Sequence, residues 1–131
     1  MDEDFRIVEP VFRGIHARVW PDGADRPRAL SILGEDELAI YVTRLLEGQV
    51  DNGGWYQLFG NGEDYLIEPA IAAYEHLGLP DYAEVVRAVR DAGFAEDSPE
   101  ELGERLDARY FRLSGSENAR ADLVRDRGLE Q

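Results

Sequence analysis

Residues 66–92, LIEPAIAAYEHLGLPDYAEVVRAVRDA, contain the pattern that decides the fold class. Apolar residues recur every three or four positions on both sides of Gly78, and this period is typical of amphipathic α-helices. Gly78 accepts the positive φ of a helix C-terminus, and an apolar residue follows it, as in a Schellman motif. Pro80 is suited to the first turn of a new helix. The short connection therefore predicts an antiparallel hairpin of two helices, over about residues 66–77 and 80–92.

The segment before the hairpin predicts a longer helix that is interrupted. Residues from Glu35 to about Val50 carry apolar side chains at helical spacing, and they begin with three acids suited to a helix N-terminus. Asp51-Asn52-Gly53-Gly54 ends this helix, because glycine and asparagine accept positive φ. Trp55 to Phe59 then predicts one or two helical turns, which Gly60-Asn61-Gly62 closes.

Two further helices are predicted after the hairpin. Gly93-Phe94 repeats the stop signal that Gly78 provides. Ser98-Pro99-Glu100-Glu101 matches a capping box with proline at the first helical position, and it predicts a helix that reaches about Leu113. A weaker pattern predicts a last helix over Ser116–Arg127.

The first 34 residues fit two patterns. Apolar residues between Phe5 and Val19 fit a helix that is kinked at Pro10, whereas residues 15–19 alternate as a strand would. We favour the helix. The segments Trp20–Gly23 and Asp25–Pro27 are interpreted as loops, because they are rich in proline, glycine and aspartate.

Together these elements predict an all-α fold, a compact helical domain of about five to six helices that includes the hairpin. A chain of 131 residues has the length of one typical domain and is long enough to bury one hydrophobic core. We expect a single domain over residues 1–131. Its parts are an N-terminal segment of uncertain structure (1–34), a helical core (35–113) and a weak C-terminal helix (114–131).

The composition excludes several classes of protein. The chain has no cysteine and therefore no disulfide or thiolate metal site. All 14 basic residues are arginine, so a P-loop lysine and Schiff-base chemistry are excluded as well. The chain contains no run of 18 apolar residues, so no membrane span is predicted. The acidic start of the chain is unlike a secretory signal, and we expect a cytoplasmic protein.

The net charge of −14 predicts the kind of partner. Such a chain repels nucleic acid and anionic membranes and attracts basic proteins, so we expect no direct nucleic-acid binding. The charge is uneven, because residues 45–86 hold eight acids and no arginine. In the outer parts of the chain many acids have an arginine at helical spacing, as Glu101 has Arg105. We interpret the eight acids of the middle segment as the partner-binding residues: Glu47, Asp51, Glu63, Asp64, Glu68, Glu75, Asp81 and Glu84.

A simpler interpretation of the charge stays open. Abundant acids and arginine in place of lysine can be a habit of a whole proteome, and acidity alone keeps a protein soluble. Glu68 and Asp81 are also suited to the N-terminal turns of their helices.

The sequence carries no recognisable catalytic motif. The chain has few residues that could act as a nucleophile: four serines, one threonine, no cysteine and no lysine. No serine lies in a Gly-x-Ser-x-Gly elbow. His16 and His76 are far apart in the sequence and belong to no pair with metal-ligand spacing. We expect no enzyme activity, no cofactor and no metal site. A hydrolase that uses two carboxylates remains an alternative, because 28 acids offer many pairs.

Residues 49–61, QVDNGGWYQLFGN, followed by residues 72–79, AAYEHLGL, carry a family resemblance. They are similar to a bacterial family of helical domains named after a DNA-mimic protein, and the match covers roughly residues 36–113. The resemblance implies an all-α fold and an acidic helical surface that occupies the DNA site of a DNA-binding regulator. We interpret Asn52, Gly53, Gly54 and Gln57 as scaffold residues that satisfy backbone groups, not as a binding pocket.

We hypothesise that the chain is a non-catalytic acidic protein, a DNA mimic that binds a basic partner such as a DNA-binding regulator. The alternatives are an immunity or inhibitor module that blocks a basic toxin, and the hydrolase above. The hairpin over residues 66–92 is expected to present its acids outward as a continuous negative surface. The sequence predicts no particular oligomeric state.

Overall fold

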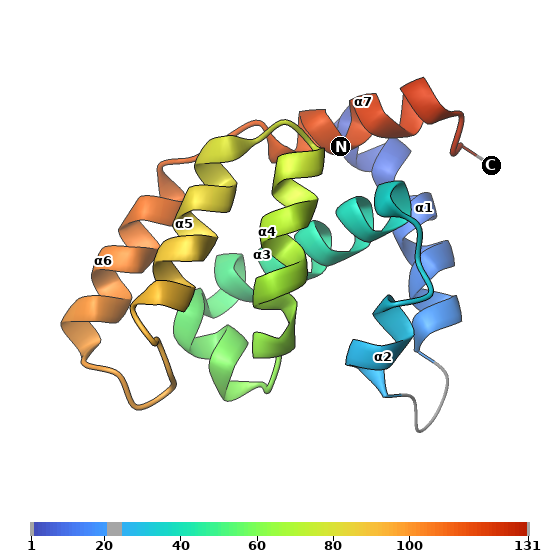
Figure 1. Ribbon diagram of the computed structural model, residues 1–131. Coiled ribbons are helices and arrows are strands. Elements are labelled where there is room, and N and C mark those ends of the chain that lie inside the picture. Colours follow the sequence, from blue (N-terminus) through green and yellow to red (C-terminus); the bar gives the residue numbers. More distant parts are fainter. Residues whose placement is uncertain (1, 21–24, 131) are drawn as a thin grey trace.

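A computed structural model describes residues 2–20 and 25–130, and the predicted hairpin lies at its centre (Figure 1). Helices α4 (Ile67–His76) and α5 (Pro80–Asp91) run antiparallel. Gly78 has φ of 73°, and the amide of Leu79 donates to the carbonyl of Tyr74 at 2.9 Å. This is the hydrogen bond of a Schellman motif, so the predicted stop is confirmed.

Helix α3 (Glu35–Gly60) contains the predicted break. Its helical geometry fails at Gly53 and Gly54, where φ and ψ are −154° and 18°, then 72° and −171°. Residues before and after this kink are helical, as expected from the two apolar stretches. A short 3-10 helix, η1 (Asp64–Leu66), then leads into α4.

The C-terminal third forms α6 (Glu100–Phe111) and α7 (Ser116–Arg127). The bounds of α7 agree with the prediction. The predicted capping box at Ser98, before α6, is wrong. The Ser98 hydroxyl accepts from the amide of Ala95 at 2.9 Å, and no side chain caps α6. The loop before α6 uses this serine, so the helix begins two residues after it.

The N-terminal segment is helical, as favoured. Helix α1 (Glu3–Val19) continues through Pro10, so the alternative strand over residues 15–19 is wrong. The loop assigned to Asp25–Pro27 is also wrong, because Asp25 caps the short helix α2 (Arg26–Leu30) by accepting from the amide of Arg28. Of the loop expected over Trp20–Gly23, residues 21–23 lie outside the described residues. Helix α2 brings the total to seven α-helices in the described ranges, one more than the five to six expected.

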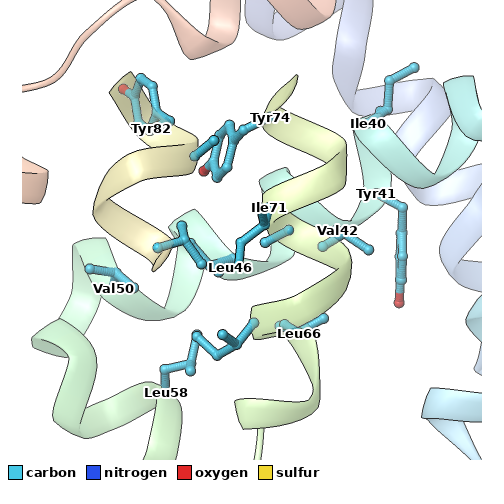
Figure 2. Close-up of a cluster of buried hydrophobic side chains, with 14 of the residues drawn as sticks. Ile40, Tyr41, Val42, Leu46, Val50, Leu58, Leu66, Ile71, Tyr74 and Tyr82 are labelled. Carbon is cyan, nitrogen blue, oxygen red and sulfur yellow. The ribbon is translucent and has the colours of Figure 1, made fainter. Parts of the chain in front are cut away.

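The helices enclose a core to which α1 through α7 all contribute. Helices α4, α5 and α6 stand side by side, and α4 and α6 pack against α3, while α7 lies along α1 (Figure 1). Figure 2 shows the side chains of Leu46, Ile71, Tyr74 and Tyr82 gathered between α3, α4 and α5. Trp55, just after the kink, has no exposed surface. The all-α class is therefore confirmed. No helix in the described part of the chain is long and apolar enough to cross a membrane.

Candidate acidic interaction surface

The eight acids of residues 45–86 do not form one surface, and Glu47 is the clearest exception. Its side chain is buried, and its two carboxylate oxygens accept four hydrogen bonds. Both terminal nitrogens of Arg120 donate, at 2.8 and 3.0 Å, and the hydroxyls of Tyr74 and Ser116 donate at 2.7 and 2.8 Å. Glu47 is thus an internal anchor between α3, α4 and α7. Its assignment to the partner-binding set is wrong.

The pKa values of Tyr74 and Arg120, which both contact Glu47, are raised, as expected around a buried ion pair. Burial, and then the charge of Glu47, raises the pKa of Tyr74 well above its ordinary value. Burial by itself would lower the pKa of Arg120, but attraction and hydrogen bonding to Glu47 more than offset this, and that pKa is raised. The guanidinium of Arg120 therefore stays charged inside the core.

Glu63 is also buried, so it cannot contribute to an exposed surface either. Arg26 donates to its Oε1 at 3.0 Å. The same guanidinium lies over the ring of Trp20, 3.0 Å from the centroid. Because Arg26 comes from α2, outside residues 45–86, the pairing was invisible to a count of local charges.

The two acids on α4 are exposed but paired across the hairpin. Arg90 donates to Glu68 at 3.2 Å, and Arg87 lies 2.9 Å from Glu75. Both arginines belong to α5 and lie just beyond the arginine-free segment. The hairpin therefore does not present a continuous unpaired negative surface, contrary to expectation. Exposed pairs of this kind contribute little to stability, and Glu68 and Glu75 keep 69% and 54% of their side-chain surface exposed.

The remaining four acids of the predicted set are exposed and form no ion pair within the residues that the structure describes: Asp51, Asp64, Asp81 and Glu84. Asp51 is the only one of these four with a hydrogen bond from a side chain in the described ranges, because the hydroxyl of Tyr110 donates to it at 2.9 Å. The other three lie in η1 and on the outer side of α5.

A second group of acids was missed by the sequence analysis. Five exposed acids lie in the α5–α6 loop and the first turns of α6, and none has an ion pair in residues 2–20 and 25–130. We call this group the acidic end: Glu96, Asp97, Glu100, Glu101 and Glu104. The expected pair between Glu101 and Arg105 does not form. The available signal was the spacing, five acids within nine residues that contain no arginine.

The acidic end is held against the short helical turns after the kink. The hydroxyl of Tyr56 donates to the carbonyl of Ser98 at 2.6 Å, which fixes the loop between Glu96 and Glu100. Burial, followed by the charges of Glu100, Asp107 and Glu104, raises the pKa of Tyr56. Burial is the larger cause, and the three carboxylates add to it with their negative charge at this end of α6.

The polar motif residues at the kink bind other side chains, and not the backbone groups that the sequence interpretation expected. Asn52 donates to Gln57 at 3.2 Å, and Asn61 donates to Gln49 at 2.8 Å, so the polar side chains bind one another across the break. The amide of Trp55 donates to Asp107 of α6 at 3.0 Å. These contacts attach α6 to the corner of α3.

The two histidines take part in contacts between helices. Nδ1 of His16 lies 2.9 Å from the hydroxyl of Tyr41, and Nε2 of His76 lies 2.7 Å from Asp36. In the described part of the chain, no three side chains of histidine, aspartate or glutamate are grouped so that they could hold a metal ion.

Comparison with known proteins gives one match. The family model described as "DMP19-like protein" matches residues 32–127, nearly three-quarters of the chain. This range runs from just before α3 to the end of α7 and includes the kink, the hairpin and the acidic end. No curated protein and no solved structure matches the chain.

Proposed function

The chain belongs to the DMP19-like protein family, and from this membership we propose that it is a non-catalytic, acidic DNA mimic. In this proposal it binds a basic protein at the surface which that protein otherwise uses for DNA. Its contact surface comprises the acidic end together with the unpaired acids Asp64, Asp81 and Glu84. Glu68 and Glu75 can join them, because an exposed arginine pair is readily exchanged for a partner's arginine.

The distribution of unpaired charge supports this proposal. The acidic end carries five carboxylates with no arginine partner in the described residues, so a basic partner displaces no ion pair when it binds there. Helix α6 has 12 residues and is about 18 Å long. A DNA duplex of that length carries about 10 charges. The five acids lie on this helix and in the loop before it, so the acidic end supplies at most about half the charge of DNA. Carboxylates one helical turn apart also lie about 5–6 Å from each other.

The position of these acids favours binding over catalysis. The acidic end projects from a loop and the start of a helix, and its side chains are exposed. A hydrolase would need two carboxylates that converge on a shielded substrate. An immunity protein that blocks a basic toxin would use the same electrostatics, and the identity of the partner separates it from a DNA mimic.

The proposal is tested by a charge-matched pair of variants. The chain is first used to capture a partner from a native lysate at low salt, and the partner is identified by mass spectrometry. The partner's binding to duplex DNA and to the chain is then measured. We expect the two ligands to compete. We also expect the affinity for this protein to fall steeply with salt, since exposed charges are screened within about 8–10 Å near physiological ionic strength. The chain itself is expected not to bind duplex DNA.

The first variant neutralises Glu84, Glu100, Glu101 and Glu104 by replacement with glutamine. Its control changes Glu3, Asp122, Asp126 and Glu130 to the corresponding amides, which removes the same charge from α1, α7 and the C-terminal end. We expect the first variant to lose at least about tenfold more affinity than the control. Complementary charges at an interface speed the encounter of the two proteins, and the first variant removes them from the proposed contact surface. Equal losses would assign binding to bulk charge. A partner that holds DNA and this protein together would exclude mimicry.

A further inference from the structure

A pocket of about 470 Å³ lies where the end of α6 meets the start of α7. It is at the opposite end of α6 from the acidic end. Four aromatic side chains line it: Phe5 of α1, Tyr82 of α5, and Tyr110 and Phe111 of α6. Its volume is in the range of sites that bind small molecules or single side chains.

Two of the acids that line the pocket form no ion pair within the described ranges. Arg120 and Glu47 both line it, but they neutralise each other in the buried pair. Arg44 also lines it, and its guanidinium is engaged by Glu9 at 3.3 Å. Asp51 and Glu117 remain, and neither forms an ion pair with any residue that the structure describes. Glu9 also pairs with Arg13, so Arg44 keeps part of its charge. Three carboxylates and two guanidinium groups line the pocket, and its net charge is negative.

The aromatic rim supplies a second feature. Phe111 is 56% exposed, although it is large and apolar. Its ring meets that of Tyr110 edge-on, with centroids 5.2 Å apart. The hydroxyl of Tyr110 in turn donates to Oδ1 of Asp51 at 2.9 Å, which fixes this carboxylate beside the aromatic residues. Aromatic faces beside carboxylates attract organic cations, because the ring quadrupole and the negative charge act in the same direction.

We propose that this pocket binds an organic cation, a guanidinium or ammonium group on a short aliphatic stem. The stem lies against Phe111 and Tyr110, and the cationic head lies between Asp51 and Glu117. An arginine side chain of a protein partner and a free small molecule offer the same chemistry. This site does not depend on the acidic end, so the two proposals can fail separately.

The test uses propylguanidinium, the side chain of arginine without its backbone, and its uncharged analogue propylurea. Each is titrated into the ¹⁵N-labelled chain, and the backbone amide signals of Gly115, Ser116 and Asn118, which line the pocket, are followed by NMR. We expect saturable shifts for propylguanidinium with millimolar affinity, and at least about tenfold weaker binding of propylurea. Equal affinities, or no shift of these signals, would overturn the proposal.

A double variant and a matched control locate the charge that matters. Changing Asp51 to asparagine and Glu117 to glutamine keeps an acceptor for Tyr110, and we expect it to weaken propylguanidinium binding about tenfold or more. Changing Glu100 and Glu104 to glutamine removes the same charge at the other end of α6, and binding should be unaltered. The amide spectrum itself reports whether each variant is folded. Equally weakened propylguanidinium binding in both variants would assign the effect to net charge and would contradict the proposed site.

A third arm distinguishes the source of the cation. The blocked tripeptide acetyl-Gly-Arg-Gly-amide is titrated in the same way. Binding at least as tight as that of propylguanidinium assigns the pocket to an arginine side chain of a polypeptide. Clearly weaker binding of the tripeptide assigns it to a free small molecule, because the pocket walls then exclude the peptide backbone.

Discussion

Replacing Glu47 with glutamine is expected to lower the free energy of unfolding by about 3–5 kcal/mol, the usual cost of removing one partner from a buried ion pair. Arg120 has only 3% of its surface exposed, so its charge would lose its counter-ion without gaining water. The Nε of Arg120 already lacks a hydrogen-bond partner among the described residues, which leaves little to compensate the loss. The fold would keep only part of a typical stability of about 5–15 kcal/mol.

Urea denaturation followed by circular dichroism measures this effect, and the matched control is Glu75 to glutamine. Glu75 also pairs with an arginine, Arg87, at 2.9 Å, but it is exposed. Its replacement is expected to cost about 1 kcal/mol or less. Replacing Glu47 and Arg120 together by leucine and methionine should recover much of the loss, because neither charge of this pair is then left buried without its partner. A Glu47 variant as stable as the Glu75 variant would contradict the internal role assigned to Glu47.

Replacing Gly54 with alanine is expected to destabilise the protein by about 2–4 kcal/mol, the sum of a backbone cost and a packing cost. Its φ of 72° and ψ of −171° lie in a region that is essentially restricted to glycine. A Cβ there would also stand 2.5 Å from Oδ2 of Asp107. Displacing that carboxylate breaks its hydrogen bond from the amide of Trp55 and loosens α6 from the corner of α3.

Gly48 is the control for this substitution, because it lies in the regular part of the same helix. A Cβ at Gly48 would meet its nearest heavy atom, Nη1 of Arg44, at 3.7 Å, which is an ordinary contact. Alanine there is expected to stabilise the protein by about 0.5–1 kcal/mol. Thermal and urea unfolding of the two variants compare them directly. If Gly54 to alanine were as well tolerated as Gly48 to alanine, the glycine-specific kink would not be required for the fold.

Local signals in the sequence predicted most of the helices. The stops at Gly78 and Gly93 and the break at Gly53-Gly54 depend on which residues tolerate positive φ, and neighbouring residues carry that information. Local signals failed where a side chain had two possible partners. Ser98 fits a capping box by its spacing, yet it accepts from Ala95 instead. Asp25 was assigned to a loop, although aspartate is a common helix cap and here it caps α2.

The sequence by itself determined the helical class, the hairpin, the kink and the excess of acid over base. The tertiary structure alone decided which acids are available to a partner. Glu47 and Arg120 are 73 residues apart, and Glu63 and Arg26 are 37 apart. Helix propensity and capping act over a few residues, whereas an ion pair or a buried surface is made wherever packing brings two helices together. For that reason four of the eight acids of residues 45–86, unpaired along the chain, are paired with an arginine in space, while none of the acidic end is paired within the described residues.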